Sequence, residues 1–308
     1  MNPLLGLIDI TPVPIALQLG PLTIPWYGIG YAAALALGAW LADRRARERG
    51  ENPEHIANGI ILVFALGLIG ARLYSVADTW SLYASDPIKV LLPPYTGLAI
   101  YGGVIGGLVG MLIYGRRHHL NIWRWADIAV PSLFFGQAIA RWGNFFNQEL
   151  YGPPTNLPWG IAIDCAHRVP EYSCSLYPFA TTGFQPMFFY ESVLDFAGGL
   201  VALYLSRRIA GWLRDGDLVS FWLIWYGTVR GYLETFRSAY DQFFFGVSIG
   251  IIFSVVAVVL GIVLLIWRHH TSAPEAAAWV QIDQGVAGST GQDPGPGPSA
   301  DAGSEGPR

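Results

Sequence analysis

The sequence predicts an all-α integral membrane protein in which seven transmembrane helices form one bundle and carry a small extracytoplasmic cap. Three observations support this class. Hydrophobic residues make up 53% of the 308 positions and charged residues only 13%, which lies outside the usual range of soluble domains. Apolar stretches recur about every thirty residues, at lengths suited to crossing a bilayer. Clusters of arginine follow every second stretch.

Each apolar stretch is long enough to cross a hydrocarbon core of about 30 Å. Glycines inside these stretches, as in residues 101–110, predict helices that approach each other closely. One helical bundle explains this pattern better than several soluble domains, so we expect a single membrane domain over residues 1–270. The predicted spans are 23–42, 56–77, 97–115, 126–142, 186–206, 217–236 and 247–267.

The placement of basic residues predicts the orientation of the bundle. Eleven arginines follow spans one, three, five and seven, not counting Arg308, whereas only Lys89, Arg168 and Arg237 lie at the other ends. Cytoplasmic loops are enriched in Lys and Arg. We therefore expect an extracytoplasmic N-terminus and a cytoplasmic C-terminus. The first residues have no basic region of the kind that begins a cleaved signal peptide.

The segments outside the spans differ in character. Residues 143–185, between spans four and five, contain many aromatic residues, prolines and both cysteines. This composition predicts an ordered extracytoplasmic cap. Cys165 and Cys174 would lie on the oxidising side, where either a disulfide or two unpaired thiols fits the sequence. Residues 271–308 are rich in Gly, Pro, Ser, Ala and Asp, which predicts a disordered cytoplasmic tail without a chemical role.

Common catalytic and metal-binding patterns are missing from the sequence. It contains no zinc-ligand spacing, phosphate-binding loop or G-x-S-x-G motif, and four of its histidines lie in basic cytoplasmic runs. We expect no metal, no cofactor and no nucleic-acid partner.

Several ionisable residues interrupt the predicted spans. An arginine near the bilayer centre costs about 2.5–3.5 kcal/mol on insertion scales, so each requires a partner or water. Arg72, Arg141 and Arg230 all fall in the outer half of the membrane on the predicted topology. Guanidinium groups bind phosphate oxygens in a bidentate manner, so such a group of arginines predicts a site for an anionic lipid head group. The ionisable residues inside the predicted spans or at their edges are Arg72, Asp78, Asp127, Arg141, Glu149, Glu191, Arg230, Glu234 and Arg237.

The spacing of Arg230 and Glu234 leaves a simpler alternative open. Residues at i and i+4 lie on one helix face and can form a purely structural ion pair. Three arginines at one depth exceed what helix packing alone requires. We therefore interpret Arg230 as functional and leave both explanations open for Glu234.

The segment RWGNFFNQELYG at 141–152 resembles the R-x-G-N-F-x-N-x-E-x-x-G signature of the prolipoprotein diacylglyceryl transferases. Further stretches agree in the same order, and the resemblance covers about residues 15–268. They are PWYGIGY (25–31), GLIGARLYSV (67–76), GLAIYGGVIGG (97–107), QPMFFYES (185–192) and WYGTVRGYLETFR (225–237).

The resemblance implies a reaction. Members of this family, which are enzymes of the bacterial cytoplasmic (inner) membrane, transfer the diacylglyceryl group of phosphatidylglycerol to the lipobox cysteine of a preprolipoprotein. The product is a thioether, and glycerol phosphate is released. The implied partners are phosphatidylglycerol and signal peptides that carry a lipobox cysteine, with no metal or organic cofactor.

The resemblance also assigns residues to lipid binding. It implies that Arg141 holds the lipid head group and that the amides of Asn144 and Asn147 bind its oxygens. Gly152 would allow a close backbone approach at a turn. We expect Arg72 to contribute to the same lipid site.

A second group of residues is expected to act in the reaction. Arg230 would stabilise charge on the departing phosphate, Glu149 would orient Arg141 or contact the lipid glycerol, and the Tyr27 hydroxyl would reach the lipid. For Tyr27 an interfacial anchoring role is the alternative. The predicted catalytic residues are Arg230, Tyr101, Glu149 and Tyr27, and the residues expected to support them are Glu234, Arg237 and Glu191.

The sequence departs from the family pattern at Tyr101, because many members carry a histidine before the two glycines at 102 and 103. A phenol, with a reference pKa near 10, is a poor base at neutral pH. Tyr101 could relay a proton while a carboxylate such as Glu149 accepts it. The base is therefore open.

Two other classes of function would also require arginines in the membrane. A seven-helix transporter or lipid flippase is one, although the spans show no inverted repeat of broken helices and the polar motif lies at the outer edge. A non-catalytic lipid-binding scaffold is the other. Formation of a thioether-linked product distinguishes the enzyme from both.

Overall fold

The computed structural model describes residues 7–8, 10, 12–20, 22–84, 86–90, 99–237 and 243–271. Within them the chain forms seven α-helices, and each overlaps one predicted span. The helices are α1 (Trp26–Glu48), α2 (Glu54–Asp78), α3 (Ile100–Arg117), α4 (Ile122–Phe146), α5 (Met187–Arg208), α6 (Asp217–Glu234) and α7 (Ile249–Thr271). A mostly helical chain is thus confirmed. Except for Thr271, the predicted tail lies outside the described residues.

The composition of the helices differs along the chain. Among the described residues, α2, α5 and α7 are long and apolar enough to cross a membrane. The other four are more polar: α1 and α3 have arginines in their last turns, α4 contains Asp127 and Arg141, and α6 contains Arg230. These helices place part of that polarity against neighbouring helices, as the buried Asp127 shows.

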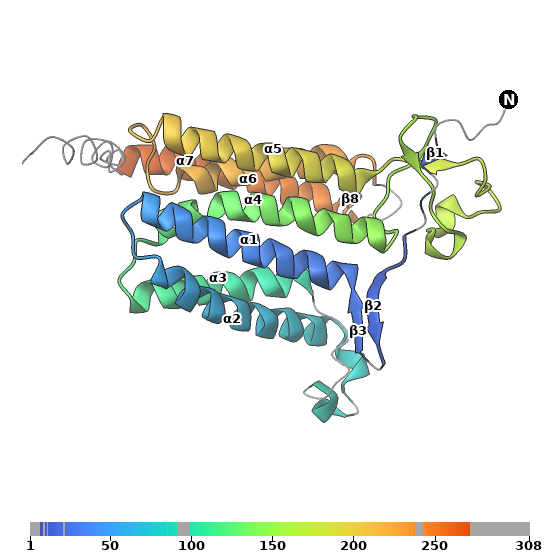
Figure 1. Cartoon of the computed structure of the whole chain (residues 1–308), viewed down its shortest axis with the longest axis horizontal. Coiled ribbons are helices and arrows are strands. Elements are labelled where there is room, and N and C mark those ends of the chain that lie inside the picture. Colours follow the sequence, from blue (N-terminus) through green and yellow to red (C-terminus); the bar gives the residue numbers. More distant parts are fainter. Residues whose placement is uncertain are drawn as a thin grey trace, which may run out of the picture.

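The helices run side by side in one bundle (Figure 1). The closest pairs are α2 with α3, α6 with α7, α1 with α4, and α4 with α5. Short β-strands lie at one end of the bundle, and α7 ends at the opposite end (Figure 1). The end with the strands also holds the C-terminal half of α4, where the RWGNFFNQELYG segment begins at Arg141, and the start of α5, which carries Glu191.

Helices α2 and α3 touch through their backbones. A Cβ atom on Gly102 would overlap with the carbonyl oxygen of Gly70, and one on Gly106 would overlap with that of Leu66. Only glycine fits at these crossings, which confirms the close packing predicted from the glycine-rich stretch.

The cap between α4 and α5 contains short strands that the sequence did not predict. Cys165 and Cys174 form a disulfide with Cα atoms 5.6 Å apart, so the first of the two alternatives is correct. The aromatic side chains of Tyr151, Phe184 and Phe188 belong to one buried hydrophobic cluster. One sheet has the order β1-β5-β6-β4, from β1 (Leu7–Ile8), β4 (Pro154–Thr155), β5 (Gly160–Ile161) and β6 (Gly183–Phe184).

Two antiparallel hairpins complete the same end of the molecule. One precedes α1 and joins β2 (Ile15–Leu19) to β3 (Leu22–Pro25), and the other precedes α7 and joins β7 (Phe243–Phe244) to β8 (Val247–Ser248). Short 3-10 turns complete the described loops: η1 (Trp80–Leu82), η2 (Pro87–Val90), η3 (Cys165–His167) and η4 (Pro170–Tyr172).

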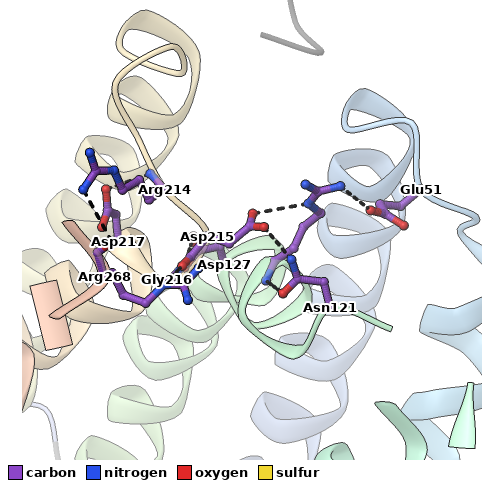
Figure 2. Close-up of polar contacts among 9 residues, drawn as sticks. Glu51, Asn121, Asp127, Arg214, Asp215, Gly216, Asp217 and Arg268 are labelled. Carbon is purple, nitrogen blue, oxygen red and sulfur yellow. Dashed lines mark hydrogen bonds and ion pairs between the residues drawn. The ribbon is translucent and has the colours of Figure 1, made fainter. Parts of the chain in front are cut away.

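A polar network ties the helices together at the end opposite the cap (Figure 2). The buried carboxylate of Asp127 accepts hydrogen bonds from the backbone N–H groups of Gly216 (2.8 Å) and Val219 (2.9 Å), at the start of α6. Arg124 joins Asp215 to Glu51, which links the loop before α6 to the loop before α2. Asp127 therefore satisfies free N–H groups of a helix N-terminus, which explains one of the ionisable residues in the spans.

Candidate active site

A carboxylate near the start of α5 gathers three arginines at the cap end of the bundle. Glu191 is 2% exposed. Its Oε2 lies 2.7 Å from Nε of Arg141, and its Oε1 lies 3.2 Å from both Nη1 of Arg230 and Nη2 of Arg237. Arg141 comes from α4 and Arg230 from α6, and Arg237 lies three residues after the end of α6. Residues far apart in the sequence therefore meet at one carboxylate.

The predicted pair of Arg230 and Glu234 is also present. Nη2 of Arg230 lies 2.7 Å from Oε2 of Glu234, and the hydroxyl of Ser248 donates a hydrogen bond to Oε1 of Glu234 at 3.4 Å. Gly250 of α7 lies directly against this carboxylate, since a Cβ atom there would overlap with it. Arg230 therefore lies between the carboxylates of Glu191 and Glu234, and its ion pair with Glu234 is part of the arginine cluster.

The cluster carries donors that the described residues do not satisfy. Arg237 is 2% exposed, and its Nε and Nη1 atoms have no hydrogen-bond partner in the described part of the chain. Buried donors of a charged group are costly when unpaired. An anion that reaches the cluster would accept hydrogen bonds from these donors. It would also find an excess of positive charge, because three guanidinium groups are paired with only two carboxylates.

The end of α4 forms the border of this cluster. The side-chain amides of Asn144 and Asn147 donate to Oε1 of Glu149, at 2.9 and 3.4 Å. Glu149 therefore contacts the two asparagines that the sequence assigned to lipid binding. Tyr27 packs on Gly143, where a Cβ atom would overlap with its ring, and its hydroxyl lies within electrostatic range of Arg141 and Glu149.

The close backbone approach expected at Gly152 is to other residues of the same chain, Gln185 and Met187. Its backbone N–H donates to the carbonyl of Gln185 at 2.9 Å, and a Cβ atom would lie 2.7 Å from Cε of Met187. The glycine thus joins the end of the motif to the start of α5, and so helps to place Glu191. Sequence reasoning missed a similar residue, Gln148, whose Oε1 accepts the backbone N–H of Asp164 at 2.8 Å and attaches the motif to the cap.

Two predicted site residues make their contacts elsewhere. Arg72 donates to the carbonyl of Val90 at 3.2 Å and lies over the ring of Tyr83. Tyr101 is 49% exposed and packs its ring against Phe253, with centroids 5.5 Å apart. We find no hydrogen bond from its hydroxyl to any described residue. The structure thus brings together Arg141, Arg230, Arg237, Glu191 and Glu234. It places Arg72 and Tyr101 in other contacts. The roles predicted for all of these residues remain predictions.

Known proteins match this chain over most of its length. The sequence model of the family described as prolipoprotein diacylglyceryl transferase matches residues 14–267. A phosphatidylglycerol–prolipoprotein diacylglyceryl transferase of Chloroflexus aggregans is 41% identical over 225 residues, 70% of this chain and 73% of its own length. The Synechococcus elongatus protein of that name is 38% identical over 270 residues, 86% of this chain and 91% of its own. The Bacillus velezensis one is 36% identical over 260 residues, with 84% and 93% covered.

Proposed function

This chain belongs to the prolipoprotein diacylglyceryl transferase family, and from that premise we propose its reaction. It transfers the diacylglyceryl group of phosphatidylglycerol to the lipobox cysteine thiol of a preprolipoprotein. The thiol sulfur attacks the glycerol carbon that bears the phosphate ester. The C–O bond breaks, a thioether forms, and glycerol phosphate leaves.

The observation that carries this proposal is the meeting of three guanidinium groups at Glu191. The phosphate of the lipid is a tetrahedral anion with several oxygens, and arginine forks bind such oxygens in pairs. Arg141 and Arg237 hold the phosphate in the ground state. Arg230, held by Glu191 and Glu234, stabilises the charge that develops on the leaving oxygen.

The border of the cluster contributes contacts to the lipid glycerol. Asn144 and Asn147 keep Glu149 in place through their amides, and Glu149 accepts a hydrogen bond from a glycerol hydroxyl. Tyr27, beside Gly143, contacts the same head group. Arg72 stays a proposed lipid contact at the edge of the bundle and Tyr101 a proposed proton relay.

The arrangement of the bundle supports a topology. All seven helices cross the cytoplasmic membrane of a bacterium, with the N-terminus and the cap outside and the arginine-rich loops inside. Residues 1–270 form this membrane domain, and 271–308 form a cytoplasmic tail. Two features support the orientation: the Cys165–Cys174 disulfide lies in the cap, where an oxidising compartment would maintain it, and α7 ends at the opposite end of the bundle (Figure 1).

A reconstitution experiment tests the function. Purified protein is incubated with vesicles that contain phosphatidylglycerol and with a lipobox peptide, and the peptide is analysed by mass spectrometry. We expect a thioether-linked diacylglyceryl peptide, and none when the lipobox cysteine is replaced by serine. Movement of lipid across the bilayer without a covalent product would instead indicate a flippase, and lipid binding alone would indicate a scaffold.

A further inference from the structure

Among the residues that the structure describes, one acidic side chain beside the arginine cluster has no hydrogen-bond or ion-pair partner. Asp195 lies on α5, one turn after Glu191, and is 2% exposed. Its Oδ2 atom is buried and accepts no hydrogen bond from any described residue. Buried carboxylates in native proteins nearly always have such partners, so an acid left without one indicates a group that binds or exchanges something absent from the folded chain.

The other carboxylates of the site are engaged. Glu191 is held by three arginines, Glu234 by Arg230 and Ser248, and Glu149 by Asn144 and Asn147. A carboxylate that neutralises a guanidinium is a weak proton acceptor, because protonation would break the ion pair. In the described chain, Asp195 is the acid of this cluster that combines burial with an unengaged oxygen.

The surroundings of Asp195 place it at the inner limit of the polar site. Arg141 of α4 and Glu191 of α5 are close enough for their charges to act on it, and Tyr226 and Arg230 of α6 lie near the same two residues. One turn further along α5, Gly198 packs against the rings of Phe134 and Trp225. Asp195 therefore lies between the arginine cluster on one side and apolar side chains on the other.

This position suits the geometry of the reaction. A displacement at carbon requires the nucleophile to approach opposite the leaving oxygen. If the phosphate binds the arginines at the level of Glu191 and the glycerol carbon is directed into the bundle, the thiol attacks from deeper in the bundle. Four residues along a helix correspond to about 6 Å, which puts the carboxylate of Asp195 on the attacking side.

We propose that Asp195 is a catalytic residue that accepts the proton of the lipobox thiol. This inference rests on the proposed transferase function. The proton passes from Sγ to Oδ2 of Asp195 as Sγ forms its bond to the glycerol carbon. The C–O electron pair leaves with the phosphate, and the proton then passes from Asp195 to the released glycerol phosphate. The chemistry needs neither a metal nor an additional reactant, and it supplies an acceptor where Tyr101 replaces the histidine of many family members.

The test compares Asp195→Asn with wild type on two peptides, one with the lipobox cysteine and one with selenocysteine, whose selenol is already ionised at neutral pH. General-base catalysis contributes about 10²–10⁴-fold, so we expect Asp195→Asn to lower kcat for the thiol peptide by that factor at pH 7. The loss should shrink above the reference thiol pKa of about 8.5 and should be small for the selenocysteine peptide. Binding of phosphatidylglycerol should not change. Asp78→Asn, an exposed acid at the end of α2, is the matched control and should behave as wild type.

The outcomes separate this inference from the proposed function. Wild-type protein that forms no thioether refutes the function itself. Transfer by wild type together with near-normal transfer by Asp195→Asn refutes only the role of Asp195, and so does an equal slowing with both peptides, which a purely structural role predicts. If Asp195→Asn does not fold, the pH profiles of wild type decide. The kcat for the thiol peptide must fall on acidification through an ionisation that lies below the reference thiol pKa of about 8.5 and that the selenocysteine peptide lacks. Identical profiles, or a fall at the thiol pKa alone, overturn the proposal.

Discussion

Replacing Glu191 with glutamine tests the centre of the site, because the change keeps the shape of the side chain and removes its charge. Glu191 is the only carboxylate in ion-pair contact with Arg141 and Arg237 among the described residues, and it shares Arg230 with Glu234. Both Glu191 and Arg237 are 2% exposed. Solvent therefore screens these charges little, and the low value of surface ion pairs does not apply.

Breaking a buried ion pair by removal of one partner costs about 3–5 kcal/mol, because the other charge is left uncompensated. At about 2–4 °C per kcal/mol, the midpoint of thermal unfolding should fall by about 6–20 °C in detergent. Added phosphatidylglycerol should raise that midpoint more in Glu191→Gln than in wild type, since its phosphate supplies the missing negative charge.

The matched control is Glu171→Gln, an exposed acid in the cap, which should change stability by no more than about 0.5 kcal/mol. Equal melting of the two variants would refute the argument that Glu191 compensates the arginines. An equal response of wild type and Glu191→Gln to phosphatidylglycerol would refute the claim that the lipid phosphate binds there.

Four further predictions follow from the site and the cap. Arg141→Lys replaces a bidentate fork with a point charge, and loss of a charged hydrogen bond worth about 1.5–3 kcal/mol should weaken head-group binding at least about tenfold in a lipid titration; wild-type affinity would contradict the role. Tyr101→Phe should slow transfer without changing the melting temperature if its hydroxyl relays the thiol proton, and a wild-type rate would remove Tyr101 from the proton path. Deletion of residues 271–308 should leave transfer unchanged in the reconstituted assay, and a loss would show that the tail takes part. Replacing Cys165 and Cys174 with alanine should destabilise the cap by about 2–3 kcal/mol, measured as faster proteolysis of residues 153–183, and equal cleavage would show that the disulfide is dispensable.

The sequence was most informative where local chemistry determines structure. Apolar length located all seven helices, and the dense motif that starts at Arg141 located the polar end of α4. The spacing of Arg230 and Glu234 predicted their ion pair, since a helix repeat fixes which side chains are neighbours.

Features that depend on tertiary contacts could not be predicted. The sequence showed an acid at 191 but not that three arginines from other segments converge on it. It gave no reason to select Asp195, because the environment of a buried acid is created by helices α4 and α6, which are distant in sequence. Arg72 looked equivalent to Arg141 by depth, yet its contacts go to Val90 and Tyr83. The short strands of the cap contain only two residues each, too few to show an alternating pattern.

The contact between α2 and α3 has a consequence for how a two-chained lipid reaches the arginines. Where Gly70 and Gly102 meet, no side chain separates the backbones, so no rotamer change can widen this seam. We therefore expect α2 and α3 to stay packed together, and a lateral opening for the lipid to form between other helices, where side chains can change rotamer.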